Sequence, residues 1–190
     1  MANRKDSVLY IALGTSGAFT VEQCQKIFTI LKDLGKPCLI ASAASELKEL
    51  RVPKNSKLVA WSPQLEVLAH PSVKGFLTHA GWNSTLEAVL AGKATICAPL
   101  FAEQLFNSKL LTYEWKGSVG WITDPPATSQ LEPRPPVMKK DEEVKKIFLT
   151  FYGAEGEAAA AQMKKLREQI LDKMKNKDEL AALRNALLRD

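Results

Sequence analysis

A short run of polar residues between two apolar segments offers groups that bind anions. His79 follows the apolar segment 75–78, which is predicted as a strand, and Asn83 and Ser84 precede a segment, 86–90, with the apolar spacing of a helix. The Asn-Ser pair is predicted to be the helix N-cap. Backbone N–H groups and the positive end of the helix dipole converge where such a helix begins, so the sequence predicts an anion site there.

Two side chains of the same run extend this prediction. His79, at the end of the strand, adds a hydrogen-bond donor that can reach a phosphate. Glu87 lies one turn inside the predicted helix, where its carboxylate can accept hydrogen bonds from the hydroxyl groups of a sugar. A phosphate site beside a group that binds a sugar diol indicates a phosphorylated ligand of the nucleotide type.

The surrounding stretch, residues 61–104, carries a longer pattern. It reads Trp-Ser-Pro-Gln at 61–64, His-Pro at 70–71, the polar run at 78–87, and Pro-Leu-Phe-Ala-Glu-Gln at 99–104. Over its 44 positions it resembles, without a gap, the donor-binding signature of the UDP-sugar-dependent glycosyltransferases of plant secondary metabolism. The resemblance implies the C-terminal, donor-binding domain of the two-domain fold called GT-B.

The resemblance assigns residues of this chain to three parts of a UDP-sugar. The uracil and ribose would be bound by Trp61, Ser62, Gln64 and Glu87, with the indole stacked on the uracil. The diphosphate would be bound by Thr15, His79, Gly81, Asn83 and Ser84. The sugar would be bound by Trp82, Glu103 and Gln104.

Structural explanations compete for several of these residues. Trp61 stands at the end of a predicted strand, where a tryptophan is often a core or rim residue. Asn83-Ser84 would serve equally as an ordinary helix cap, and 103–104 as the opening of a helix. His70, before a proline, is interpreted as a structural histidine.

The resembling family transfers a sugar from UDP to an acceptor oxygen with inversion at the anomeric carbon. No metal or other cofactor is implied, because histidine, hydroxyl and backbone donors stabilise the leaving diphosphate. The family's general base lies in its N-terminal domain, whereas this chain begins at the first strand of the C-terminal domain and has only His70 and His79. No catalytic residue is therefore expected in this chain.

The resulting hypothesis is the donor half of a glycosyltransferase that acts on a small hydroxylated acceptor. UDP-glucose is the expected donor, since Gln104 resembles the residue of glucose users. A separate N-terminal acceptor-binding domain or chain would be its partner. The alternatives are a non-catalytic UDP-sugar-binding module and an engineered isolated domain.

Composition narrows the class of protein further. Of 190 residues 46% are hydrophobic and 25% charged, and no apolar run approaches the roughly 20 residues of a membrane span. The first residues lack a hydrophobic signal core, so we expect a cytoplasmic protein. The net charge of +5 is modest, and in the C-terminal third Lys alternates with Glu as on a solvated helix face, so nucleic acid is not expected as a partner. Cys24, Cys38 and Cys97 lack metal-ligand spacing.

Strands that alternate with helices must position the candidate site. Strands are expected at 8–13, 37–41, 58–61, 75–78, 94–98 and 119–122, and helices from Thr20 to 34, at 65–69, through 86–90 and at 103–113. This alternation predicts an α/β fold, a doubly wound, Rossmann-like parallel sheet with helices on both faces. Ligands of such sheets lie at the carboxyl ends of the strands. Residues 14–15, Trp61, His79 and 99–104 all fall at those ends.

The last third of the chain is predicted to be helical. Residues 123–137 hold five prolines and are predicted to form a surface loop, and helices are expected at 139–152, 154–175 and 177–189. We expect residues 1–137 to be the UDP-sugar-binding core and residues 138–190 to pack on it, as a single domain overall. For the last helix a solvent-facing tail and a partner-binding role stay open.

Overall fold

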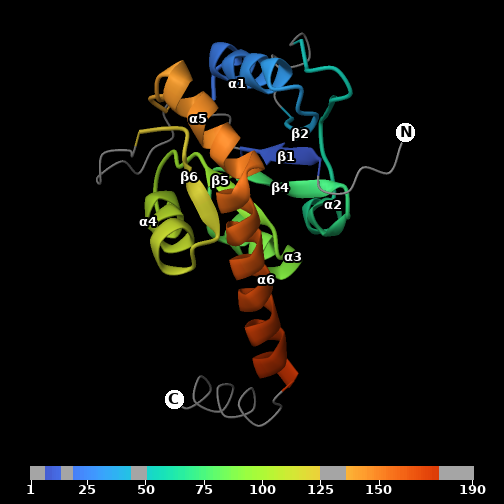
Figure 1. Ribbon diagram of the computed structural model, residues 1–190, viewed down its shortest axis with the longest axis vertical. Coiled ribbons are helices and arrows are strands. Elements are labelled where there is room, and N and C mark those ends of the chain that lie inside the picture. The colour runs from blue at the N-terminus through green and yellow to red at the C-terminus, as the bar shows by residue number, and fades with distance from the viewer. Residues whose placement is uncertain (1–6, 14–18, 44–50, 125–135, 176–190) are drawn as a thin grey trace.

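The computed structural model describes residues 7–13, 19–43, 51–124 and 136–175 (Figure 1). Within these residues six parallel strands form one sheet in the order β3-β2-β1-β4-β5-β6. The strands are β1 Val8–Ala12, β2 Cys38–Ala41, β3 Lys57–Val59, β4 Val73–Thr78, β5 Ala94–Cys97 and β6 Ser118–Trp121. The prediction of a doubly wound, Rossmann-like α/β sheet is confirmed.

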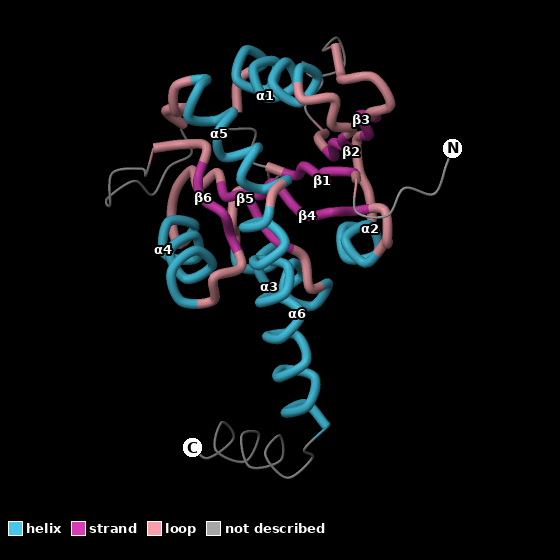
Figure 2. Tube along the Cα trace, in the orientation of Figure 1, coloured by secondary structure: helices cyan, strands magenta, loops and turns pink. Residues whose placement is uncertain are grey.

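Helices cover both faces of this sheet (Figure 2). They are α1 Val21–Asp33, α2 Gln64–Ala69, α3 Trp82–Ala91, α4 Gln104–Lys109, the π-helix η2 Leu110–Glu114, α5 Asp141–Tyr152 and α6 Ala154–Lys175. One hydrophobic cluster joins α1 and α5 to one face of the sheet, and a second joins α2, α3, η2 and α6 to the other. The sheet is therefore the middle of three layers.

The central strand β1 shows how the sequence builds these layers. Its side chains alternate between the faces: Leu9 and Ile11 belong to the cluster under α1, and Tyr10 to the cluster over α2 and α3. Tyr10 pairs in register with Leu39 of β2 and Phe76 of β4. A strand that is covered on both faces has to be apolar almost throughout, which explains the continuous run predicted at 8–13.

Two predicted elements end differently in the structure. The strand expected at 58–61 ends at Val59, so Trp61 lies in the following loop. Pro63 follows closely, and a proline both lacks an N–H and restricts the residue before it, which favours a loop at this point. The helix expected at 103–113 changes at Leu110 into a π-helix, where the N–H of Trp115 donates to the carbonyl of Leu110, five residues back.

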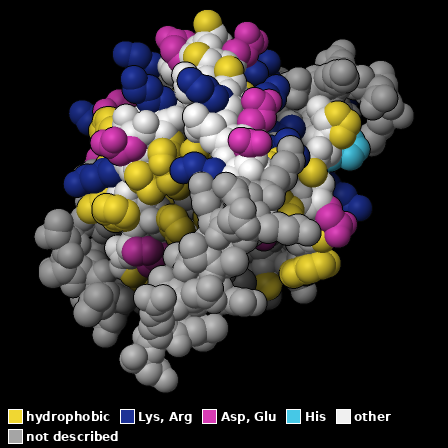
Figure 3. Space-filling view, turned by 90° about the horizontal axis from the view of Figure 1, so that it is seen from below, with side chains coloured by type: hydrophobic (Ala, Val, Ile, Leu, Met, Phe, Trp, Pro, Cys, Tyr) yellow, Lys and Arg dark blue, Asp and Glu magenta, His cyan; other side chains and the backbone are white. Residues whose placement is uncertain are grey.

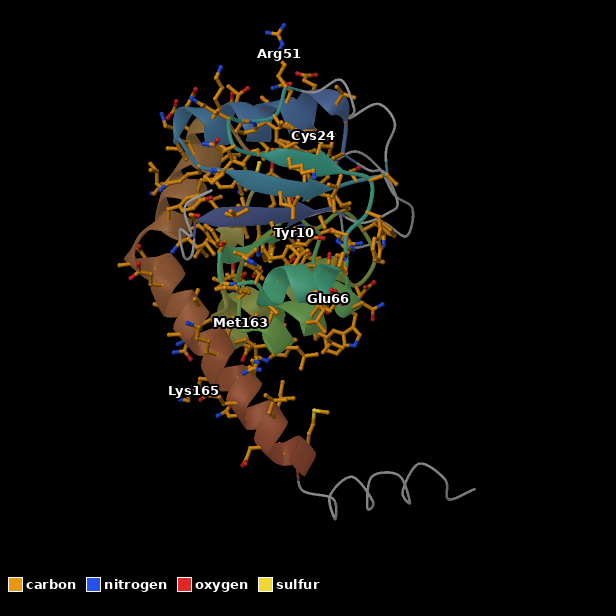
Figure 4. All side chains as sticks on the ribbon, turned by 90° about the vertical axis from the view of Figure 1, so that its right-hand side faces the viewer. Tyr10, Cys24, Arg51, Glu66, Met163 and Lys165 are labelled. Atoms are coloured by element: carbon orange, nitrogen blue, oxygen red, sulfur yellow. The ribbon has the colours of Figure 1, made fainter. Side chains whose placement is uncertain are left out.

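The helices α5 and α6 correspond to the predicted helices at 139–152 and 154–175. Along α6, Ala159 packs in the first cluster and Met163 in the second, so this helix crosses from one layer to the other. Figure 4 shows Met163 on the side of α6 that faces the sheet and Lys165 on the outer side. Met163 lies against Gly117, which precedes β6, so α6 crosses at the amino ends of the strands.

The carboxyl ends of the strands are thus on the opposite edge from α6. The helix predicted at 177–189 and most of the proline-rich loop at 123–137 lie outside the described residues. The division of the chain at residue 137 stays a prediction.

Helix composition and surface charge bear on the expected location and partners. Within the described part of the chain, no helix has the length and apolar character needed to cross a membrane. Lys, Arg, Asp and Glu side chains lie interspersed on the face seen in Figure 3. The cytoplasmic location and the lack of a nucleic-acid partner stay predictions.

The buried thiols of the core lead to a prediction about alkaline pH. Burial raises the pKa of Cys24, between α1 and the sheet (Figure 4), and of Cys38 from 9.0 to about 11. Because the unfolded thiols ionise first, their contribution to stability is complete below pH 9 and is lost as the pH rises toward 11. We expect the free energy of unfolding to fall by about 1 kcal/mol per thiol by pH 10.

Urea titrations at pH 8 and pH 10 measure this loss. The variant Cys24→Ala/Cys38→Ala should lose less stability over the interval than the wild-type chain does. Equal losses in the two proteins would show that these thiols do not titrate differently in the folded and unfolded states.

Candidate functional site

The candidate site lies where the strand order reverses direction. From β1 the sheet continues to β2 on one side and to β4 on the other, and Ala12 and Thr78, the last residues of β1 and β4, are paired. Such a reversal leaves a crevice at the carboxyl ends of the two strands, which is the usual ligand position in this architecture. His79 is the first residue beyond β4. Thr15, predicted beyond β1, lies outside the described residues.

The turn between β4 and α3 is fixed around Ala80. This residue is completely buried and has φ of 61°, in the left-handed region that residues other than glycine seldom adopt. Its N–H donates to Thr78 Oγ1 at 3.1 Å. Its carbonyl accepts from Asn107 Nδ2 at 2.9 Å and from Thr85 Oγ1 at 3.4 Å. Three side chains therefore hold one strained residue in place.

The helix α3 begins earlier than predicted. Its N-cap is Gly81, and no side chain caps the first turn. The prediction that Asn83 and Ser84 form the N-cap is wrong, because the extended backbone of Gly81 (φ −60°, ψ 152°) starts the helix at Trp82. Asn83 and Ser84 lie in the first turn instead. Gly81 has no side chain to cap this turn, and the N–H of Trp82 donates to Glu103. The next N–H groups, those of Asn83 and Ser84, are therefore the ones that an anion can use.

His79 packs against the start of this helix. A Cβ on Gly81 would lie 2.5 Å from His79 Nε2, so only glycine allows the imidazole this position. Burial lowers the pKa of His79 below its ordinary 6.5, while the Ala12 backbone and the Glu103 carboxylate act in the opposite direction. Among the described residues, its Nδ1 is buried without a hydrogen-bond partner. At neutral pH His79 is a neutral imidazole that can donate one hydrogen bond.

A group of polar side chains connects α2 to α3 beside the turn. Gln64 Nε2 donates to Ser84 Oγ at 3.0 Å and to Glu87 Oε2 at 2.5 Å. Its Oε1 accepts from the hydroxyl of Tyr10 at 3.4 Å, and the same hydroxyl is 3.0 Å from Ser62 Oγ. The structure thereby brings together Ser62, Gln64 and Glu87, predicted for a nucleoside, with Ser84, predicted for a phosphate.

The two tryptophans of the predicted site are exposed. Trp61, in the loop between β3 and α2, has 77% of its surface accessible, and Trp82 at the start of α3 has 46%. This exposure excludes the interpretation of Trp61 as a core residue. An indole in contact with solvent at the carboxyl edge of a sheet is available to stack on a planar ring.

Glu103 and Gln104 lie at the start of α4, as the structural explanation predicted. The side chain of each also accepts a hydrogen bond from a neighbouring backbone segment. Glu103 Oε1 accepts from the N–H of Trp82 at 3.3 Å, which ties α4 to the start of α3. Gln104 is 5% exposed, and its Oε1 accepts from the N–H groups of Leu100 and Phe101. Its Nε2 is the remaining amide group that can donate to a ligand.

Sequence reasoning missed two residues of this region. Tyr10 carries the one polar side-chain atom of β1, and Asn107 is a fully buried amide on α4. A polar group in the otherwise apolar strand β1 is the signal that could have found Tyr10, since such a group needs a partner in the interior. Asn107 has no such signal, because the buried residues of its helix, Gln104, Asn107 and Ser108, are all polar.

The arrangement has a definite chemical capacity. An uncapped helix start with a neutral histidine can bind an anion, and a carboxylate one turn further can bind hydroxyl groups of an adjoining ring. Within the described residues, no group of three or more His, Cys, Asp or Glu side chains is placed to hold a metal ion.

Comparisons with known proteins agree with this geometry. The family model described as "UDP-glucoronosyl and UDP-glucosyl transferase" matches residues 2–123. UDP glycosyltransferase 9 of Catharanthus roseus is 39% identical over 124 residues, 60% of this chain and 26% of the relative. UDP-glycosyltransferase 72B2 of Arabidopsis thaliana is 34% identical over 189 residues, 87% of this chain and 37% of the relative. The chain thus spans between a quarter and two fifths of these relatives' length.

Solved structures show the same likeness. Os79 from O. sativa in complex with UDP has a TM-score of 0.72 and 29% identity, over 87% of this chain and 36% of Os79. UGT2 of Phytolacca americana, complexed with UDP-2fluoro-glucose and pterostilbene, has a TM-score of 0.69 and 28% identity, over 88% of this chain and 37% of UGT2.

The contact between His79 and Gly81 generates a prediction. In a Gly81→Ala variant the new Cβ displaces the imidazole toward solvent, so the pKa of His79 should rise toward 6.5 as its burial is relieved. NMR titration of the histidine signals measures this, with His79→Gln to assign the resonance. An unchanged pKa of His79 in Gly81→Ala would show that the burial of the imidazole does not depend on a glycine at position 81.

Proposed function

Because the chain belongs to the UDP-glucoronosyl and UDP-glucosyl transferase family, we propose that it binds the UDP-sugar donor of an inverting glycosyltransferase. The observation that carries the proposal is the group formed by Gln64, Ser84 and Glu87, which adjoins the uncapped start of α3 at the reversal of the strand order. Both structural neighbours described above were solved with UDP or a UDP-sugar analogue, which supports the same ligand here.

The nucleoside would lie over α2 and the first turns of α3. Trp61 stacks on the uracil in this proposal, since its indole is exposed and every base presents a flat ring face. Glu87 accepts hydrogen bonds from the ribose hydroxyls with the carboxylate oxygen that Gln64 leaves free. Ser62 and Gln64 complete the polar edge of this part of the site.

The diphosphate would lie at the start of α3. The first N–H groups of the helix, Asn83 and Ser84, and the neutral imidazole of His79 donate to its oxygens, and Gly81 lets them approach closely. These donors stabilise the negative charge that develops on UDP as the sugar leaves. On this basis we propose transfer without a metal or other cofactor. Thr15 stays a proposed phosphate ligand on the resemblance alone.

The sugar would lie between α3 and α4, beside Trp82. Glu103 and the Nε2 amide of Gln104 are the proposed partners of its hydroxyl groups. A buried amide held by two backbone N–H groups presents one fixed orientation, which suits discrimination between sugars. UDP-glucose is the proposed donor and a small hydroxylated compound the proposed acceptor.

The general base and the acceptor pocket are proposed to belong to a separate N-terminal domain or chain. Of the two histidines, His79 lies at the proposed phosphate site, and His70 Nδ1 accepts from the N–H of Ser72, in agreement with a structural role. The alternative is a UDP-sugar-binding module without catalysis. It would use the same site, and it differs from the donor half only in that adding an acceptor domain would not produce sugar transfer.

A calorimetric titration with UDP and then UDP-glucose, followed by an assay for free glucose, tests the proposed function. We expect both compounds to bind and glucose not to be released, because no base activates an acceptor. Transfer regained on adding the acceptor domain of a related enzyme would support the donor half, and binding without turnover under any complementation would favour the binding module. Failure of UDP to bind would overturn the proposal.

A substitution at Glu87 tests the proposed nucleoside site. Glu87→Ala should weaken UDP binding by about 1–3 kcal/mol, because the ribose hydroxyls lose their acceptor and Gln64 loses its partner. Glu66→Ala, in the exposed first turn of α2, is the matched control and should bind as the wild-type chain does. Unchanged affinity of Glu87→Ala in calorimetry would remove Glu87 from the site.

A further inference from the structure

The hydroxyl of Tyr10 lies beneath the proposed nucleoside site without reaching its surface. The residue is 1% exposed in the central strand, and its ring stacks on Phe76 with centroids 5.1 Å apart. Figure 4 shows Tyr10 on β1 close above α2, the helix that carries Glu66. A phenol held in this way cannot turn to follow its partners, so its hydroxyl is a fixed point in the interior.

The hydrogen bonds that start at this hydroxyl have one consistent direction. Tyr10 has a single proton, and it donates this proton to Gln64 Oε1. The hydroxyl then accepts from Ser62 Oγ, and Gln64 Nε2 donates to Ser84 and Glu87. The chain of donors runs from the loop before α2, through the sheet, to a carboxylate on α3.

This direction selects one orientation of the Gln64 amide. With the amide reversed, Nε2 would face Tyr10 and Oε1 would face the carboxylate of Glu87, so two acceptors would oppose each other. Burial raises the pKa of Tyr10 above 10.0, while the hydrogen bond from Ser62 acts in the opposite direction and the Glu87 charge adds a smaller increase, so the phenol keeps its proton over the neutral range. Tyr10 and Glu87 thus hold Gln64 from its two ends.

We propose that Tyr10 is a positioning residue for the donor: its hydroxyl orients Gln64, and Gln64 fixes the Glu87 carboxylate at the site of the ribose hydroxyls. The inference rests on the proposed function. Tyr10 touches neither the nucleotide nor the sugar. It acts through two side chains that do, and its effect should therefore depend on Gln64 and on the ribose hydroxyls of the ligand.

Calorimetry on the full chain with UDP and with 2′,3′-dideoxyuridine diphosphate tests this dependence. Tyr10→Phe keeps the ring and removes the hydroxyl, and it should weaken UDP binding about three- to tenfold, the range of one hydrogen bond. The affinity for the dideoxy compound, which has no ribose hydroxyls for Glu87, should change by less than about twofold. In a Gln64→Leu background, Tyr10→Phe should cause no further loss.

Tyr152→Phe is the matched control, because Tyr152 is also largely buried and its hydroxyl has no hydrogen-bond partner among the described residues. It should leave the affinity for UDP unchanged. Equal weakening of both ligands by Tyr10→Phe, or a loss that persists without Gln64, would show a general effect on folding and overturn the inference. Unchanged UDP affinity in Tyr10→Phe would also overturn the inference. A wild-type chain that does not bind UDP would instead overturn the proposed function itself.

Discussion

The carbonyl oxygen of Ala80 is the point on which the site depends. Two side chains from different helices, Thr85 and Asn107, donate to it, and Thr78 secures the same residue through its N–H. These bonds keep a buried residue in the left-handed region, at a cost of order 1–3 kcal/mol that the surrounding contacts offset. The direction in which α3 leaves the sheet follows from this residue, and with it the position of every candidate site residue that α3 carries.

The helices α2, α3 and α4 are connected through hydrogen bonds as well as through apolar packing. Gln64 connects α2 to α3, and Glu103 and Asn107 connect α4 to α3 and to the turn before it. Apolar contacts tolerate small sliding movements, whereas hydrogen bonds specify direction and distance. The three helices are therefore held in one relative arrangement at the edge of the sheet where a ligand would bind.

The sequence predicts the sheet and the edge at which the site lies better than it predicts the helix start and the hydrogen bonds of the site. Apolar runs at the strand positions and the polar run after β4 were sufficient for the sheet and for the edge at which the site lies. The start of α3 was misplaced, because Asn83-Ser84 is a good cap by composition while the backbone of Gly81 decides where the helix begins. The positive φ of Ala80 could not be predicted, since the hydrogen bonds that hold it, among them that of Asn107 from α4, form only in the folded chain. Tyr10 was counted as an apolar strand residue because its hydroxyl finds partners only in the folded chain.

The path of α6 has a consequence for the order in which the molecule is completed. The side chains discussed for the site end at Asn107, whereas the helix that joins the two hydrophobic layers is Ala154–Lys175. Domains acquire structure as they leave the ribosome, N-terminal part first. The strands and the turn around Ala80 thus emerge while the amino edge of the sheet still lacks its covering helix, and Tyr10, Phe76 and Cys97 share a layer that Met163 closes only later. The edge of the sheet that carries the candidate site is therefore synthesised before the layer beneath it is completed.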